Sequence, residues 1–404
     1  MDAITPTTDT KWQNWPKIHK LGYILDETGL SASRHRQDIA ALRGTGLAVE
    51  AFSIANRRKR EGGILRRLSG RFSGSTLDDV QDVAPNAFAQ TPADTLRLHA
   101  LAAELSAFAQ IEQLTHLHAA DAGDAAVVCN LASRLCGIPF SFGFEFGSGQ
   151  DAYEMQRADR MVEESAFVIT GSQAESAALR QALPWHADRF RSLYRAVDLS
   201  ALTPFEDDYH RRANFVAVGQ FVEAHRFSDL IEAVYLLKRM GVAAQATLFG
   251  DGPLKSYLKK LISRRGVADR VALRKITDTE YVRAYINRQA TAFVMPGIDP
   301  QDTFPVELIE AMAMGVPVLL AQTPVSREFV EDGRSGFLLK PDDPVELATR
   351  CLMFAKEPGL DRRMGQEARR RAELLFDQRT RAAQLAQWIS ESSDTEHFSQ
   401  RQAV

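Results

Sequence analysis

Short apolar runs alternate along most of this chain with longer segments of helical composition. The short runs predict strands at 21–25, 49–53, 116–118, 140–144, 167–170, 215–218, 247–249, 271–273, 293–295 and 318–321. The longer segments predict helices at 34–43, 95–108, 124–136, 174–183, 228–238, 279–288, 306–314, 344–356, 360–376 and 379–390, with one more from residue 254. Strands and helices that alternate in this way are typical of doubly wound α/β domains built on parallel sheets.

Residues 293–321 form one strand, helix, strand unit, the crossover of a parallel sheet. The helix start, near Thr303 and Phe304, exposes unpaired N–H groups and a positive dipole end, which together favour a phosphate. Asp302 lies in the loop before the helix, and Glu310 lies inside it, in an otherwise apolar row. A carboxylate there needs a partner. Either Glu310 caps a neighbouring loop through backbone N–H groups, or it binds the hydroxyl groups of a ligand.

The segment DTFPVELIEAMAMGVPV resembles the donor-site signature of the family-four glycosyltransferases, which are retaining enzymes. Their pattern is an acidic residue, seven residues, Glu, and then Ala-Met-Ala-x-Gly-x-Pro-Val. Glu310 matches the second acid, and the resemblance implies that it binds the nucleotide ribose. Asp302 stands where the first acid is usually Glu, which implies a place near the donor sugar. The resemblance also implies the GT-B fold: two facing, doubly wound, Rossmann-like α/β domains with a C-terminal helix crossing back.

Other stretches extend this resemblance. The segment LASRLCGIPFSF is similar to members that build exopolysaccharides and lipopolysaccharides, and Glu145 aligns with a His that contacts the donor sugar in them. In the family an Arg and a Lys bind the donor diphosphate without a metal. Here Gln220 replaces the Arg, His225 falls at the Lys, and Arg226 follows as a substitute cation. Gly250, in a tight turn at 250–253, is a further candidate for donor binding.

Composition limits the classes of function. The net charge of −3 argues against a general nucleic-acid binder. The three cysteines, Cys129, Cys136 and Cys351, lack metal-ligand spacing and fit a cytosolic setting. No cofactor and no metal are expected. No apolar run approaches the roughly 20 residues that are needed to span a bilayer.

The expected domains are an acceptor-side α/β domain at 19–205 and a donor-binding α/β domain at 213–378, joined by a linker at 203–212. Residues 1–18 are expected to be a disordered lead-in, and 379–404 a crossing helix and tail. An irregular insert at 54–92 concentrates cations between Arg57 and Arg71. This insert is either a solvated loop or a surface for anionic membrane, because apolar residues lie among its cations.

The resemblance implies a retaining glycosyltransferase in surface polysaccharide synthesis, which moves a sugar from a nucleotide-sugar donor to a glycan or lipid-linked acceptor. We expect a cytoplasmic protein that is peripheral at the inner face of the membrane. The alternative is a catalytically degenerate GT-B protein that regulates another enzyme, because Glu145, Gln220, His225 and Asp302 all depart from the family pattern. An oxidoreductase is not indicated, since no G-x-G-x-x-G follows the first strand.

Overall fold

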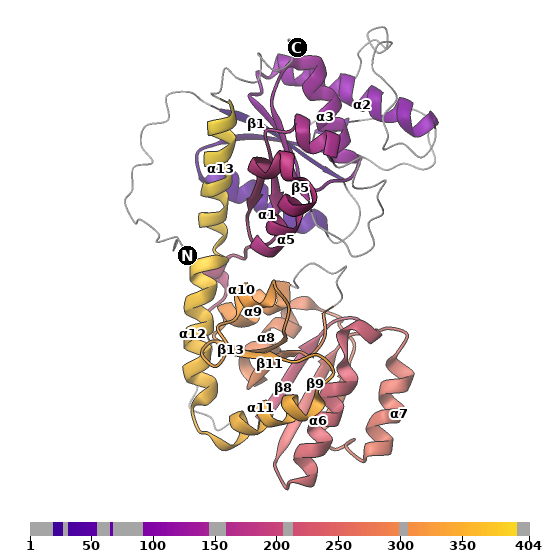
Figure 1. Ribbon diagram of the computed structural model, residues 1–404, viewed down its shortest axis with the longest axis vertical. Coiled ribbons are helices and arrows are strands. Elements are labelled where there is room, and N and C mark those ends of the chain that lie inside the picture. The colour runs from indigo at the N-terminus through magenta and orange to yellow at the C-terminus, as the bar shows by residue number, and fades with distance from the viewer. Residues whose placement is uncertain are drawn as a thin grey trace. The chain divides into compact units, whose positions relative to one another are not determined.

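The computed structural model describes residues 19–26, 31–54, 65–67, 92–144, 159–204, 213–298 and 306–393 of the 404-residue chain (Figure 1). Several sequence predictions therefore lie outside the described residues: the lead-in at 1–18, most of the basic insert and of the linker, and the final residues of the tail. The same holds for four candidate site residues, Glu145, Asp302, Thr303 and Phe304.

The first sheet has seven strands in the order β3-β2-β1-β4-β5-β6-β7. These are β1 (Lys20–Asp26), β2 (Ala48–Ile54), β3 (Leu65–Arg67), β4 (His116–Ala119), β5 (Phe140–Phe144), β6 (Phe167–Thr170) and β7 (Phe190–Ser192). The helices that alternate with them are α1 (Ser31–Gly44), α2 (Pro92–Ile111), α3 (Asp124–Cys136) and α5 (Gln173–Ala182). β1 pairs in parallel with both β2 and β4, which is the doubly wound arrangement that was expected.

One part of the basic insert differs from the sequence prediction. The insert was expected to be irregular throughout, but its residues Leu65–Arg67 form β3, which pairs antiparallel with β2. The prediction failed because β3 is short and its sequence, LRR, has no apolar alternation. Its backbone is paired because the edge of β2 offers unpaired N–H and C=O groups.

The second sheet has six strands in the order β10-β9-β8-β11-β12-β13. These are β8 (Ala213–Val218), β9 (Ala244–Phe249), β10 (Val271–Arg274), β11 (Ala292–Met295), β12 (Val318–Ala321) and β13 (Gly336–Leu339), all in parallel pairs. The longer helices are α6 (Phe227–Arg239), α7 (Lys255–Arg265), α8 (Thr279–Gln289), α9 (Val306–Ala313), α11 (Pro344–Lys356), α12 (Leu360–Leu375) and α13 (Gln378–Ser393). A short helix, α10 (Ser326–Phe329), follows β12.

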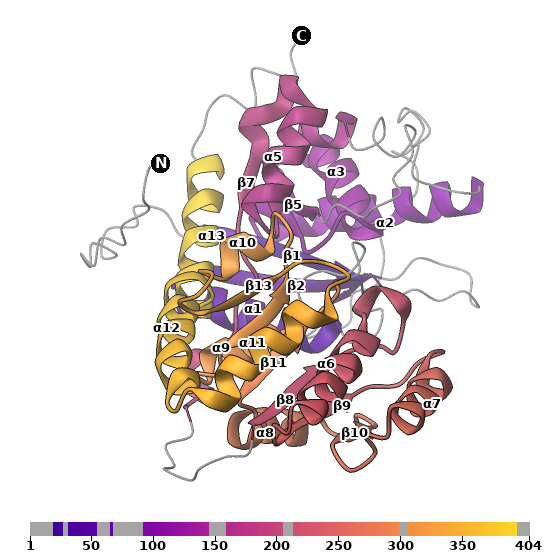
Figure 2. The ribbon, with the colours of Figure 1, turned by 60° about the horizontal axis from the view of Figure 1, so that its bottom comes forward.

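Apolar cores cover both faces of this second sheet, because its strands are apolar on both sides. Phe215 and Ala217 of β8 belong to a core with α6, α7 and α11, whereas Val216 and Val218 pack with α8 and α9 on the other face. Figure 1 shows α6 and α11 on one side of the sheet and α8 and α9 on the other. In Figure 2 α11 and α6 lie in front of the strands. Such runs are typical of parallel sheets with helices on both faces.

The chain divides into two compact units. The first contains the described residues up to Gly143, Arg160–Phe167 and the end of α13 from Ala382. The second contains Phe144, Asp159 and Val168–Arg381. Within the first unit, Trp388 of α13 packs against Phe167, with ring centroids 6.0 Å apart. The C-terminal helix thus crosses back to the first half of the chain, as expected. The domain ranges given by the sequence remain predictions. Each helix in the described ranges is too short or too polar to span a bilayer.

Candidate functional site

The candidate site lies where the second sheet changes its winding direction. β8 leads to β9 and β10 on one side, while the chain then returns to place β11 and β12 on the other side of β8. The loops that follow β8 and β11 therefore leave the same edge of the sheet in opposite directions. In open α/β sheets ligands bind in the crevice at such a switch point, outside the carboxyl ends of the strands.

Backbone hydrogen bonds tie the loop after β8 to the loop after β9. The amide of Gly219 donates to the carbonyl oxygen of Phe249 at 3.0 Å, and the amide of Phe221 donates to that of Asp251 at 2.9 Å. The amide of Leu254 in turn donates to the carbonyl oxygen of Phe221 at 2.9 Å. These bonds satisfy backbone groups within the loops, so the loop after β8 is held against its neighbour rather than left to solvent.

Two glycines allow these loops to approach closely. A methyl group at Gly250 would overlap the carbonyl oxygen of Gly219, and one at Gly297 would overlap the carbonyl oxygen of Ala224. The loops after β8, β9 and β11 are therefore in contact at the carboxyl edge. The sequence predicted Gly250 as a donor-binding residue. The structure gives it a packing role between two loops, and its contact with a donor remains a prediction.

Arg226 is bound to two carboxylates from within the second unit. Its Nε donates to Oδ2 of Asp229 at 2.8 Å, and its Nη1 forms an ion pair with Oδ1 of Asp342. The hydrogen bond to Asp229 raises the pKa of Arg226, and the charge of Asp342 adds to the effect. The Asp229 side chain is only 12% exposed, whereas that of Asp342 is 69% exposed. The predicted phosphate-binding cation is therefore already neutralised by one buried and one exposed acid.

The other two predicted phosphate-binding residues add no permanent charge. Nδ1 of His225 lies 2.8 Å from the carbonyl oxygen of Gln220, so Nδ1 carries the proton and donates it. The His225 ring also packs beside Phe227, with centroids 5.7 Å apart. Gln220 is uncharged by its chemistry. The loop is folded around these contacts, which position the His225 ring against Phe227.

Glu310 is held by an arginine from the neighbouring helix. Nη2 of Arg283, on α8, donates to Oε1 of Glu310 at 2.6 Å. Burial raises the pKa of Glu310, and the hydrogen bond with Arg283 opposes that rise. The sequence left two alternatives, backbone capping or a ligand, and missed this partner. The signal was weak, because α8 precedes β11 and its arginine has no distinctive spacing.

A second acid of the same unit, Glu328, has a role that the sequence analysis did not identify. Its carboxylate accepts hydrogen bonds from the amides of Gln173 at 2.8 Å and Ala174 at 2.6 Å, at the start of α5. It also accepts the hydroxyl of Tyr194 at 2.7 Å. A carboxylate at a helix N-terminus pairs with orphan N–H groups and the positive dipole end. Ser172 caps the same helix, because its hydroxyl oxygen accepts a hydrogen bond from the amide of Glu175.

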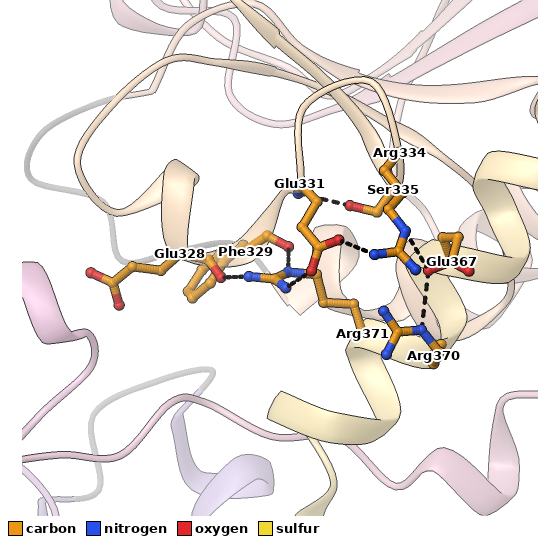
Figure 3. A network of polar contacts seen from close by, with 8 residues as sticks. All are labelled: Glu328, Phe329, Glu331, Arg334, Ser335, Glu367, Arg370 and Arg371. Atoms are coloured by element: carbon orange, nitrogen blue, oxygen red, sulfur yellow. Dashed lines mark hydrogen bonds and ion pairs between the residues drawn. The ribbon is translucent and has the colours of Figure 1, made fainter. Parts of the chain in front are cut away.

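Arg371 of α12 holds the backbone that carries Glu328. It donates to the carbonyl oxygens of Glu328 and Phe329 and pairs with Glu331 at 2.5 Å. Figure 3 shows the Glu328 carboxylate pointing away from this network, which continues through Arg334, Ser335, Glu367 and Arg370. The network thus positions the turn around α10, while the Glu328 side chain is left to bind α5.

The first unit contains a buried network of hydrogen-bonded polar side chains. The hydroxyl of Ser141 lies 2.8 Å from both Nε2 of His116 and Nδ1 of His118, and Ser392 lies 3.1 Å from Nδ1 of His116. Burial lowers the pKa of His116 well below its ordinary value, and His118 and His19 add to the effect. Both histidines are thus satisfied core residues, and no group of metal-binding side chains occurs in the described part of the chain.

A family comparison decides what kind of domain surrounds the switch point. Residues 205–371 match the model of the family described as Glycosyl transferases group 1. This part of the chain resembles a glycosyltransferase group 1 domain. The match covers the loops after β8, β9 and β11 and also Glu310, so the candidate site lies inside the domain.

Curated relatives of the glycosyltransferase domain include two named for exopolysaccharide synthesis. The chain is 32% identical over 145 residues to the putative colanic acid biosynthesis glycosyltransferase WcaL of Salmonella typhimurium, covering 35% of this chain and 36% of WcaL. It is 29% identical over 185 residues to the amylovoran biosynthesis glycosyltransferase AmsK of Erwinia amylovora, covering 45% of each. The alignments thus span less than half the length of these relatives.

Solved structures support the fold over nearly the whole chain. Anabaena HepE, in complex with UDP, has a TM-score of 0.67 and 19% identity, covering 92% of this chain and 99% of HepE. The sucrose-phosphate synthase of Thermosynechococcus elongatus has a TM-score of 0.68 and 18% identity, covering 92% and 98%. The two sheets with interleaved helices therefore form a GT-B fold, as the sequence predicted.

Proposed function

We propose that this protein is a retaining glycosyltransferase that takes a sugar from a nucleotide-sugar donor and transfers it to a glycan or lipid-linked acceptor in surface polysaccharide synthesis. The observation that carries the proposal is the meeting of the loops after β8, β9 and β11 at the β8–β11 switch point, in the part of the chain that matches Glycosyl transferases group 1 and that also contains Glu310 of α9. The names of WcaL and AmsK support polysaccharide synthesis, and the complexes of HepE with UDP and UDP-glucose support the donor class.

In this proposal Glu310 accepts hydrogen bonds from the ribose hydroxyls. Transfer leaves charge on the diphosphate, which is stabilised by oriented cations and N–H groups. Arg226 and the backbone at the start of α9, near Thr303 and Phe304, would supply these without a metal. Asp302 would lie beside the donor sugar, and Glu145 would replace the sugar-contacting histidine of the family, so these two acids are the proposed catalytic candidates.

A second candidate function is supported by the state of Arg226. Because its guanidinium already binds Asp229 and Asp342, and Gln220 is neutral, the described part of the loop presents no uncommitted arginine or lysine. A protein with this loop could bind a nucleotide weakly and serve as a partner of another enzyme. Transfer assays with a panel of nucleotide sugars separate the two functions, since only the first predicts product.

The direct test is calorimetry with UDP-glucose and other nucleotide sugars on the wild type and on Glu310→Gln. We expect donor affinity to weaken by about 1–3 kcal/mol, because the hydroxyls lose a charged acceptor. Glu232→Gln is the matched control, since Glu232 pairs with Arg265 at 2.8 Å in the same unit. Equal loss in both variants, or no loss in Glu310→Gln, refutes the assignment of Glu310.

We also propose that the protein binds the inner face of the membrane through its basic insert between Arg57 and Arg71. Each cation near an anionic surface contributes about 1 kcal/mol. Flotation with anionic vesicles should recover the wild type at low salt, and less of a variant in which Arg57, Arg58, Lys59 and Arg60 are replaced by Gln. Equal recovery of the two proteins favours the solvated loop.

A further inference from the structure

The arginine that binds Glu310 lies on a different helix from the family motif. Arg283 belongs to α8, and its guanidinium pairs at 2.6 Å with Oε1 of Glu310 through Nη2 and with Oε1 of Glu280 through Nη1. The Glu310 side chain is 12% exposed, whereas that of Glu280 is 72% exposed. The guanidinium therefore bridges a buried acid on α9 and an exposed acid on its own helix.

The two carboxylate oxygens of Glu310 differ in their hydrogen-bond partners. Oε1 is taken by Arg283, whereas Oε2 has no hydrogen-bond partner among the described residues. Nε of Arg283 is buried and also lacks a partner there. Val282 and Ile286, on either side of Arg283, pack in the same core as α9, so the helix that carries the arginine is fixed against Glu310.

We propose that Arg283 is a positioning residue, which occupies Oε1 of Glu310 and thereby directs Oε2 toward the hydroxyl groups of the ligand. The ligand part of this inference rests on the proposed function, whereas the effect of Arg283 on Glu310 does not. An arginine at this distance favours the charged form of a largely buried acid, and the charged form is the stronger hydrogen-bond acceptor.

The charges around Glu310 make its ionisation depend on this one arginine. Burial raises the pKa of Glu310, and the nearby acids Glu307 and Glu280 raise it further, whereas the hydrogen bond and the charge of Arg283 lower it. α12 also packs on α9, but its Arg369 binds the carbonyl oxygen of Ala313 at the far end of that helix. Loss of Arg283 should therefore leave Glu310 partly protonated nearer to neutral pH.

The test measures the titration of Glu310 and the binding of UDP in the same variants. Carboxyl carbon shifts in ¹³C-labelled protein report the Glu310 pKa, with Glu310→Gln used to assign the signal. In Arg283→Gln we expect the pKa of Glu310 to rise. Lowering the pH from 7.5 to 5.5 should then reduce UDP affinity about tenfold more in Arg283→Gln than in the wild type. Arg283→Lys should restore most of the wild-type profile, because it keeps a cation.

The control is Arg265→Gln, which breaks the comparable pair with Glu232 and should leave both readouts unchanged. An unchanged Glu310 titration in Arg283→Gln overturns the inference. Lower stability together with a wild-type pH profile of binding also overturns it, because the pair then has only a structural role. If Arg283→Gln does not fold, Arg283→Ala and Arg283→Lys are measured in its place. The inference is then overturned if Arg283→Ala has the wild-type pH profile of UDP binding, or if the profile of Arg283→Lys is shifted as expected for loss of the cation. A wild type that binds no nucleotide refutes the proposed function, while the carbon shifts still decide the role of Arg283.

Discussion

Replacing Asp342 by Asn should strengthen donor binding if Arg226 contacts the diphosphate. Asp342 and the donor phosphates would compete for the same guanidinium, and Asp342 is the exposed member of the two acids that hold it. Exposed ion pairs contribute about 0.2–1 kcal/mol. Removing this pair should therefore tighten binding of UDP by about 1.4- to 5-fold, with a loss of stability below about 1 kcal/mol.

Calorimetry with UDP at two salt concentrations measures the effect. The gain should be larger at low salt, since the competition is between exposed charges. Asp269→Asn is the matched control, because Asp269 is 61% exposed and pairs with Lys238 at 2.6 Å before β10, at the other edge of the sheet. It should leave UDP affinity unchanged.

Arg226→Ala completes the experiment. It should abolish most transfer activity, since removing a charge aimed at a developing anion costs a few kcal/mol of barrier. It should also lower stability by about 1.5–3 kcal/mol, because Asp229 loses a charged hydrogen bond in a nearly buried site. Wild-type UDP affinity in Arg226→Ala refutes the contact. A large loss there with no gain in Asp342→Asn refutes the competition.

Three further outcomes are expected. The double change Gln220→Arg with His225→Lys should raise UDP affinity about tenfold, because it adds two permanent cations, and calorimetry that shows no gain would contradict a phosphate site in this loop. Gly250→Ala should lower the free energy of unfolding by about 1–3 kcal/mol in urea titrations, through overlap with Gly219, and an unchanged midpoint would contradict the loop packing. Because burial lowers the pKa of His116, the native state favours its neutral form. The contribution of this histidine to stability should therefore be full above about pH 6.5 and should fall below it by about 1 kcal/mol per pH unit. Urea titrations at pH 7.5 and 5.5 should show a weaker pH dependence of stability in His116→Gln than in the wild type.

Much of the fold could be predicted from the sequence, because local chemistry defines its elements. The predicted strands at 140–144 and 318–321 and the helix at 124–136 have the observed bounds. Apolar runs that end at Pro or Gly mark buried parallel strands, and residues such as Ser172 mark helix starts through bonds to the next turn. One contiguous motif also predicted the site region, and this assignment stays a prediction, whereas the position of the loops follows from strand order.

Short edge strands were not predicted. β7 and β13 are three and four residues long, and the sequences FRS and GFLL carry too little periodicity to identify a strand. They form because a neighbouring strand offers unpaired backbone groups, so β13 depends on β12 and β7 depends on β6. That information is not present in the segments themselves.

The partners of the charged site residues were decided by the tertiary structure alone. The sequence predicted that Glu310 and Arg226 bind a ligand. It did not predict that Glu310 forms an ion pair with Arg283, or that Arg226 forms one with Asp342. Likewise, Glu328 binds amides 154 and 155 positions away, at the start of α5. Local propensity acts over a few residues, whereas a buried charge is stabilised by whichever opposite charge the packed helices and loops bring within hydrogen-bond distance.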